Sequence, residues 1–244
     1  MLSASQFTST LNLVLTSLKV NIPYAETVAH RQQVISLIYP HNTEMDLSIA
    51  CALYFASRGQ GVAYTSSNPD AAIPNYTSPA RVLLSGLGAD ELFGGYSRHP
   101  SAFARDGYAG LVDELLLDVG RLGKRNLGRD DRAMSHWGKE VRFPYLDEHL
   151  VRWAMDTPAW EKCDFANGDD GEGSGGVEAG KRVLRLLALE SGLEGVAKEK
   201  KRAVSPTPKR AFLFSLWCTN KSCNRSNSER GPLKWKAGES REPP

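Results

Sequence analysis

Residues 85–96 bring together side chains that can hold a phosphate group and a divalent cation. The run reads Ser-Gly-Leu-Gly-Ala-Asp-Glu-Leu-Phe-Gly-Gly-Tyr. It follows the apolar residues 82–84, which we interpret as the end of a buried strand. Glycines let the backbone turn tightly and bring its N–H groups close to a bound anion, and a carboxylate is a hard oxygen ligand for Mg²⁺. The run therefore predicts a strand, a phosphate-binding loop and two acids at the start of a helix.

The acids and small residues of this run each have two interpretations. Asp90 is our first candidate for a metal ligand because the glycine loop precedes it, but a first-turn acid also stabilises a helix without any ligand. For Glu91 the two interpretations are evenly balanced, since glutamate is common in first turns. Ser85, Gly86 and Gly88 are expected to shape the loop, with an ordinary tight turn as the alternative.

The elements that must position these residues alternate between helices and strands, which favours an α/β fold. The predicted helices are residues 24–38, 45–56, 108–125, 149–155 and 183–190. Strands are predicted at residues 62–64 and 82–84, and residues 143–146 are expected to be extended because of Pro144. Residues 66–79 and 164–180 are interpreted as loops, and residues 1–19 as the remnant of a helix.

Composition excludes some classes of protein. The net charge is only +2, so nothing in it indicates nucleic acid as a partner. The apolar stretch at residues 11–18 is shorter than the roughly 20 residues that cross a bilayer, and no signal peptide precedes it. We therefore expect no membrane partner and a cytoplasmic location. Cys51 is expected to be a buried free thiol, and a zinc pair at Cys218 and Cys223 lacks further ligands.

Several ordered segments resemble the asparagine synthetase family. Residues 85–96 resemble its second nucleotide-site motif, residues 138–147 its Glu-x-Arg-x-Pro-Phe-Leu-Asp segment, and residues 181–185 its Lys-x-x-Leu-Arg helix. Segments that resemble a eukaryotic subgroup of the family lie at residues 39–43, 46–50, 56–59 and 125–132. The resemblance covers about residues 20–203.

The resemblance implies an adenine-nucleotide α-hydrolase-like (PP-loop ATPase) parallel sheet with helices, with the N-terminal part of the domain missing. It implies ATP and Mg²⁺ as cofactors and aspartate as a ligand. In the family reaction, the aspartate side chain is adenylated and ammonia from glutamine then displaces AMP. By resemblance, Asp90 would bind Mg²⁺ and Glu140 would point toward the acyl-adenylate. Lys201, or its neighbour Arg202, would stabilise developing charge.

Two sets of charged residues keep alternatives open. Glu140 and Arg142 share one face of an extended stretch, so Glu140 could equally form a structural ion pair. Four arginines fall near one helical face and could meet an anionic substrate or pair with Asp130 and Asp131; the second interpretation is favoured for most of them. These arginines are Arg121, Arg125, Arg129 and Arg132.

The sequence also departs from the family. No Ser-Gly-Gly-x-Asp-Ser pyrophosphate loop occurs before Ser85. Met1 is followed directly by Leu2 and not by the cysteine nucleophile with which the glutaminase domain of the family begins. Leu87 stands where active members of the family usually carry an acid. We therefore expect the C-terminal part of a longer protein or a truncated gene model, with a missing glutaminase region as a partner. Residues 1–203 would be the partial domain, and residues 204–244 a disordered, non-homologous tail. A non-catalytic protein that acts through protein contacts is the alternative function.

Overall fold

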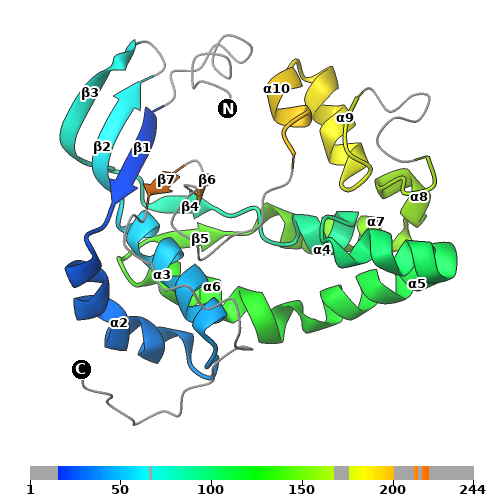
Figure 1. The fold of residues 1–244 in the computed structure, drawn as a ribbon, viewed down its shortest axis with the longest axis horizontal. Helices are drawn as coiled ribbons and strands as arrows, with labels where there is room; N and C mark the ends of the chain where they lie inside the picture. The colour runs from blue at the N-terminus through cyan, green and yellow to red at the C-terminus, as the bar shows by residue number, and fades with distance from the viewer. Residues whose placement is uncertain (1–15, 66–67, 168–175, 201–211, 214–215, 220–244) are drawn as a thin grey trace.

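The computed structural model describes residues 16–65, 68–167, 176–200, 212–213 and 216–219. These residues form two small sheets and a set of helices, so the architecture is mixed α/β as the sequence predicts (Figure 1). One part holds the larger sheet with three helices against it. The other part is helical, and the long helix α5 (Arg98–Leu122) runs from it toward the first (Figure 1).

The larger sheet has five strands in the order β3-β2-β1-β7-β6. Their bounds are Thr16–Asn21 for β1, Gln60–Thr65 for β2, Asn68–Thr77 for β3, Phe212–Leu213 for β6 and Leu216–Thr219 for β7. Strand β1 pairs antiparallel with β2 and parallel with β7, whereas β2 with β3 and β6 with β7 are antiparallel. The described sheet is therefore mixed, not the parallel sheet that we expected.

Helices α2 (Tyr24–Ile38), α3 (Glu44–Arg58) and α6 (Gly128–Ser135) pack on this sheet. Leu18 and Val20 of β1 are buried against them, because alternate side chains of a strand point to one face. Helix α3 begins one residue before and ends two residues after the predicted range 45–56. Its N-cap Thr43 accepts a hydrogen bond from the Asp46 amide, and Gly59 ends it in the left-handed conformation.

The helical part contains the remaining short elements. They are α4 (Ala89–Phe93), the π-helix η1 (Gly123–Leu127), the 3-10 helix η2 (Pro144–Leu146), α7 (Glu148–Asp156), α8 (Ala159–Lys162), α9 (Arg182–Glu190) and α10 (Glu194–Ala197). Leu111 and Leu115 of α5 pack with α8, while Leu92 and Phe93 of α4 pack with α7 and α9. No helix among the described residues combines the length and apolar character that a membrane crossing needs.

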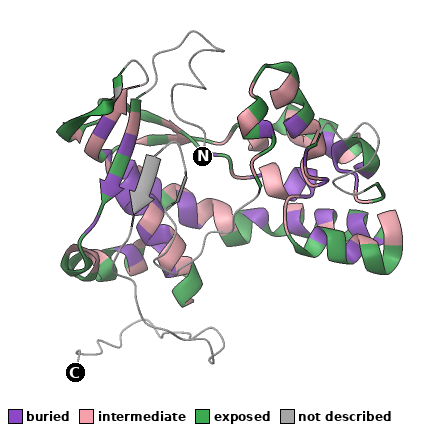
Figure 2. Cartoon of the chain, turned by 45° about the horizontal axis from the view of Figure 1, so that its top comes forward, coloured by how far each residue is buried: buried purple, intermediate pink, exposed green. Residues whose placement is uncertain are grey.

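The second sheet is the parallel pair β4 (Val82–Leu84) and β5 (Glu140–Arg142). We expected the first of these strands to be buried, and this expectation is wrong. The side chain of Leu84 is 71% exposed and that of Val82 is 49% exposed. Figure 2 shows buried segments, in purple, both in the sheet-bearing part at the left and in the helical part at the right. A pair of strands covers little of its own surface, so three apolar residues do not guarantee burial.

Three further expectations are corrected. Residues 68–77 form strand β3 and not a loop, because Pro and Asn are tolerated in an edge strand and β3 lies at the sheet edge. Only two residues separate β2 from β3, and a short connection makes neighbouring strands antiparallel. Thr16–Asn21 is a strand and not the remnant of a helix. Residues 144–146 form one 3-10 turn that follows the extended Phe143.

The expected tail contains two described strands, β6 and β7, and the first of them is too short to be predicted from a period of hydrophobicity. The remaining residues of 204–244 lie outside the described residues. The side chains of Cys218 and Cys223 also lie outside the description, and the division at residue 203 stays a prediction. Cys51 is a buried free cysteine, as expected.

A buried lysine completes the end of α7. The carbonyl of Ala154 lacks its usual helical donor, because the residue four positions later is Pro158. The ammonium of Lys162 donates to this carbonyl instead. The Lys162 side chain is almost fully buried, and burial lowers its pKa. The lysine thus replaces a missing backbone donor at the cost of desolvating a charge.

Replacing Lys162 by methionine is expected to lower the free energy of unfolding by about 1–2 kcal/mol, since a buried carbonyl loses its donor. The loss is moderate because the variant also removes a buried ammonium. Urea unfolding followed by circular dichroism measures it. The control Lys198→Met removes a partly exposed lysine that pairs with Glu194, and a change below about 0.5 kcal/mol is expected. Equal stability of Lys162→Met and the parent chain would contradict the argument.

Candidate phosphate-binding site

The predicted loop begins where β4 ends beside β5. The amide of Ser85 donates to the carbonyl of Arg142 over 2.9 Å, which extends the pairing of the two strands by one residue. The hydroxyl of Ser85 accepts from the Leu87 amide at 3.3 Å and so closes a small turn. Gly88 has φ +100°, and a β-carbon there would lie 2.6 Å from Leu146 Cδ2. The turn therefore requires glycine at position 88.

The other glycine of the loop faces open space. A β-carbon on Gly86 would meet no heavy atom within 4 Å. None of the described residues accepts a hydrogen bond from the N–H of Gly86 or of Gly88. Backbone N–H groups in such a turn can donate to an anionic oxygen. The local geometry thus leaves both room and donors for an anion.

Asp90 lies in the first turn of α4, directly after the loop. Its Oδ1 is 2.8 Å from the Nζ of Lys181, a residue that comes from far along the chain. The two side chains are 25% and 24% exposed, although the Oδ1 atom of Asp90 that makes the pair is itself buried. A β-carbon on Gly95 would lie 1.9 Å from the same oxygen of Asp90. The position of the Asp90 carboxylate therefore depends on a glycine at position 95.

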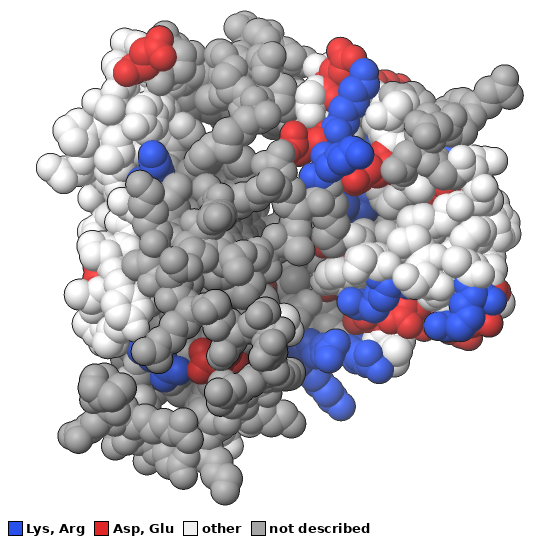
Figure 3. Space-filling view, viewed as in Figure 1, with Lys and Arg blue, Asp and Glu red and all other residues white. Residues whose placement is uncertain are grey.

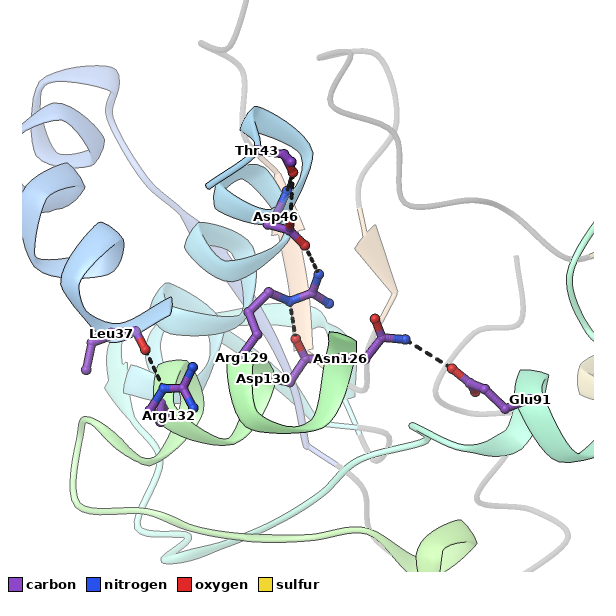
Figure 4. A network of polar contacts seen from close by, with 8 residues as sticks. All are labelled: Leu37, Thr43, Asp46, Glu91, Asn126, Arg129, Asp130 and Arg132. Atoms are coloured by element: carbon purple, nitrogen blue, oxygen red, sulfur yellow. Dashed lines mark hydrogen bonds and ion pairs between the residues drawn. The ribbon is translucent and has the colours of Figure 1, made fainter. Parts of the chain in front are cut away.

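Glu91 points away from solvent and is only 3% exposed. Its Oε1 accepts from the Tyr96 hydroxyl at 2.6 Å and from the Asn126 amide at 3.0 Å (Figure 4). Burial raises the pKa of Tyr96, and the hydrogen bond to Glu91 raises it further, so the hydroxyl stays protonated and donates. The structure thus places Glu91 where it anchors α4 to the π-helix.

A buried histidine supports the same turn from the other side. His99 Nδ1 accepts from the Tyr96 amide at 3.1 Å, so the ring proton is on Nε2 and is donated to Asp118 over 2.9 Å. Asp118 also pairs with Arg98 at 2.5 Å. These contacts fix the segment that follows α4 and carries Gly95.

Helix α6 carries a second polar cluster (Figure 4). The guanidinium of Arg129 is buried and pairs with Asp46 of α3 at 2.6 Å and with Asp130 at 2.7 Å. Burial raises the pKa of Asp130 even though Arg129 lowers it. Arg132 donates to the backbone carbonyls of Leu37 and Tyr39 at 2.6 and 2.8 Å. Arg129 pairs with Asp130, as the structural interpretation predicted, but it is buried and also joins α6 to α3 through Asp46. The contacts of Arg132 go to backbone carbonyls and not to the predicted acids.

Glu140, which resemblance placed in catalysis, lies away from the loop. Glu140 starts β5 opposite Val82, while the loop begins opposite Arg142 at the other end of the strand. The Glu140 carboxylate pairs with Arg142 at 2.6 Å, and both side chains are more than half exposed. This is the ion pair that the sequence left open as an alternative. Lys201 lies outside the described residues.

The structure therefore brings Ser85, Gly86, Gly88 and Asp90 together and adds Lys181. In the sequence, Lys181 stands out only as the first residue of the Lys-x-x-Leu-Arg segment, and no role was predicted for it. No role was predicted for Asn126 either, although it shares a segment with the arginines. The described residues contain no group of three or more His, Cys, Asp or Glu that could hold a metal. One carboxylate nonetheless fits Mg²⁺, which keeps several waters and takes few protein ligands.

Charges of both signs lie next to one another on the face seen in Figure 3. Basic and acidic side chains are interspersed over the described helices at the right of that view. Such mixed charge produces no extended field of one sign on the described part of this face. The ammonium of Lys181 beside Asp90 is thus a local positive charge and not part of an extended basic surface on the described part of this face.

The profile of the asparagine synthase family matches residues 19–113 and 104–215. These matches cover most of the chain, including the loop, Asp90 and Lys181, and extend past Ala203, where we expected the resemblance to end. The chain belongs to the asparagine synthase family.

Relatives of two kinds share parts of the sequence. The chain is 44% identical over 174 residues to asparagine synthetase domain-containing protein 1 of Mus musculus, which is 71% of this chain and 26% of that protein. It is 50% identical over 78 residues to putative asparagine synthetase [glutamine-hydrolyzing] 1 of Methanocaldococcus jannaschii, covering 32% of this chain and 14% of the relative. Asparagine synthetase B [glutamine-hydrolyzing] of Escherichia coli is 38% identical over 76 residues, 31% of this chain and 13% of the relative. The chain spans about a quarter of the length of the domain-containing relatives.

Proposed function

We propose that this chain is an asparagine synthetase-like, ATP-dependent amidoligase domain in the cytoplasm that works in asparagine biosynthesis. The proposed reaction converts aspartate, ATP and an amide nitrogen from glutamine or ammonia into asparagine, AMP and pyrophosphate. Family membership supports this reaction, as do the names of two relatives that describe glutamine-hydrolysing synthetases. The chain matches only part of each relative, so a glutaminase region would be a partner.

A PP-loop ATPase fold is part of this proposal. The two strands next to the loop, β4 and β5, are parallel. In open α/β sheets, ligands bind beyond the carboxyl ends of parallel strands, and Ser85 lies at that end of β4. The position of the loop supports a nucleotide site there.

We assign each site residue a role in that reaction. The N–H groups of Gly86 and Gly88 bind phosphate oxygens, and Asp90 holds Mg²⁺. Bound ATP supplies the adenylyl group that activates the aspartate carboxylate. Ser85 and Gly88 hold the loop in shape, and Glu91 fixes α4 behind it. We also propose for Glu140 and Lys201 the catalytic roles that the resemblance implies. The support for these two roles is the resemblance and not the geometry of the loop.

One observation carries the proposal. A partly exposed acid lies directly after a glycine turn whose N–H groups have no acceptor among the described residues. The test is isothermal titration of the full chain with ATP and Mg²⁺, repeated on Asp90→Asn. We expect the variant to bind at least about tenfold more weakly, since it loses a charged ligand of the metal. Asp156→Asn changes an exposed acid at the last residue of α7; it is the matched control and should bind as the parent does.

The second candidate is a non-catalytic protein that acts through protein contacts. Leu87 favours it, because this half-buried leucine sits inside the loop and can neither accept a hydrogen bond nor carry charge. Absence of binding heat in a chain that circular dichroism shows to be folded would select this candidate.

A further inference from the structure

The turn 94–96 is a part of the backbone that lies directly against the Asp90 carboxylate. A β-carbon on Gly95 would lie 1.9 Å from Asp90 Oδ1, so no space separates this turn from the acid. The Gly95 amide also donates to the Asp90 carbonyl at 2.9 Å. A shift of the turn would therefore shift the acid, and the contacts that hold the turn decide how well Asp90 is placed.

Tyr96 connects this turn to the helices on either side of it. Its hydroxyl donates to Glu91 Oε1 at 2.6 Å, and the guanidinium carbon of Arg98 lies 4.1 Å from the centre of its ring. Its amide donates to His99 Nδ1 at 3.1 Å. The first two contacts hold the side chain of Tyr96, whereas the bond to His99 holds the backbone at the point where the turn meets α5.

His99 is oriented by an acid from the far end of the same helix. Its Nε2 donates to Asp118 Oδ2 at 2.9 Å, although the 19 residues between them would span about 28 Å in a straight helix. The contact forms because α5 is kinked at Asp106 and Gly107, whose backbone is not helical. The imidazole is 0% exposed and Asp118 is 4% exposed. Packing and the bond to Asp118 thus leave Nδ1 as the acceptor.

The start of a helix does not by itself require such an arrangement. A Glu or Gln in the first turn can accept from a backbone amide before the helix without leaving solvent. Here an imidazole and a carboxylate are buried together, which costs free energy unless both are bonded. The bond to Asp118 fixes the orientation of the His99 ring and the nitrogen that accepts. This arrangement holds the Tyr96 amide more rigidly than a solvated capping side chain would.

We propose that His99 is a positioning residue of the loop site. Its Nδ1, kept as an acceptor by Asp118, holds the Tyr96 amide and thereby keeps the Asp90 carboxylate where it binds the divalent cation. This proposal rests on the proposed nucleotide site and adds to it a residue that acts only through other residues. Loss of the Nδ1 acceptor should weaken ligand binding although every ligand-binding group is still present.

The test compares two substitutions that each keep the role of one ring nitrogen. His99→Asn places an amide oxygen near Nδ1 and can still accept from the Tyr96 amide, while His99→Gln places an amide N–H near Nε2 and can still donate to Asp118. In titrations with Mg-ATP, we expect His99→Gln to bind about fivefold more weakly than the parent and His99→Asn to bind within about twofold of it, since one neutral hydrogen bond separates them. The control His149→Gln changes an exposed histidine of α7 and should bind as the parent does.

Thermal unfolding separates positioning from a merely structural role. Both variants lose one buried hydrogen bond, so the unfolding temperature of both should fall. Asparagine also leaves the larger void, so binding that only followed stability would be weaker in His99→Asn than in His99→Gln. The proposal predicts the opposite order. Equal weakening of binding in the two variants, or stronger binding by His99→Gln, would overturn it.

Hydrogen exchange tests the same contact in the parent chain, whether or not the variants fold. If the bond between Tyr96 and His99 favours the ligand, the bound ligand must favour that bond by the same factor. Saturation with Mg-ATP should therefore slow exchange of the Tyr96 amide by about fivefold. The Gly59 amide, which bonds to Ala56 at the end of α3, is the control and should not change. Unchanged exchange at Tyr96 in a saturated chain would overturn the proposal.

A second probe, Mn²⁺ alone, separates this proposal from the proposed function. Carboxylates suit Mn²⁺ as they suit Mg²⁺, and electron paramagnetic resonance measures the free ion. Binding of Mn²⁺ that is weaker in His99→Gln than in His99→Asn, by a chain that does not bind Mg-ATP, would support positioning of Asp90 and contradict the nucleotide function. Equal binding of Mg-ATP by the parent and both variants would overturn the positioning role and leave the proposed function intact. A folded parent chain that binds neither probe would overturn both.

Discussion

Replacing Arg129 by methionine is expected to lower the free energy of unfolding by about 3–5 kcal/mol, because it leaves buried acids without their cation. Arg129 pairs with Asp46 and Asp130, and all three side chains are largely shielded from solvent. Removing the guanidinium leaves two carboxylates facing one another without a cation. Urea unfolding at pH 7 measures the loss. Arg132→Met removes only donors to two backbone carbonyls at an exposed position and should cost about 1 kcal/mol.

The pH dependence of this loss follows from Asp130. Burial raises its pKa above the ordinary 3.8 in the folded chain. Such a group stabilises the fold below its unfolded pKa, and this contribution is lost as the pH rises through the folded pKa. Without Arg129 the folded pKa rises further, because the opposing cation is gone. The difference between the variant and the parent should therefore shrink between pH 7 and pH 5. A constant difference would contradict burial of the acid as its cause.

Replacing Gly95 by alanine is expected to displace the Asp90 carboxylate. The new β-carbon would lie 1.9 Å from Asp90 Oδ1 and 3.0 Å from its Cα, so rotation of the side chain alone does not relieve the clash. We expect the free energy of unfolding to fall by about 1–3 kcal/mol, as in other overpacked sites. Binding of Mg-ATP should weaken by more than about tenfold, since the acid and Lys181 lose their common position. Titration calorimetry and urea unfolding measure the two effects.

Gly86→Ala is the matched variant for Gly95→Ala. Its β-carbon enters open space, so the stability should change by less than about 0.5 kcal/mol. Because the methyl group projects into the space where an anion would lie, ligand binding should still weaken. If Gly95→Ala proves as stable as Gly86→Ala and binds Mg-ATP normally, the described Asp90 geometry is wrong.

The helices could be predicted well from the sequence. The bounds of α2 agree with the prediction at both ends, because Pro23 precedes it and Pro40 follows it closely. The cap at Thr43 and the glycine at position 59 define α3. The burial of individual apolar side chains on these helices is less predictable: Val28 of α2 and Leu116 of α5 are about half exposed. The periodicity of a helix indicates that one face is apolar but does not say how much of it a neighbour covers.

The sheets could not be predicted to the same extent, since pairing is decided by residues far apart in the chain. Strand β1 joins β2 to β7, and nothing local in its sequence selects these partners. The site shows the same division. The loop and Asp90 form one continuous run that the sequence alone identifies. Lys181 and Asn126 are distant in the chain and come to lie beside Asp90 and Glu91 only in the folded structure. The local signal for Lys181 is the Lys-x-x-Leu-Arg segment that it begins, and this segment does not reveal the contact with Asp90.

The parallel pair β4–β5 has a consequence for the order of events in folding. Val82 pairs with Glu140, and helices α4, α5 and α6 all lie between them in the chain. Forming this pair closes a long loop, which costs chain entropy, and buries few side chains. We therefore expect the two strands to pair late in folding and to separate early in unfolding. The amides of these strands should exchange their hydrogens among the fastest of the paired backbone. The strands at the base of the loop 85–88 are thus the part of the site that we expect to open first, and a ligand bound to the loop would slow the exchange of their amide hydrogens.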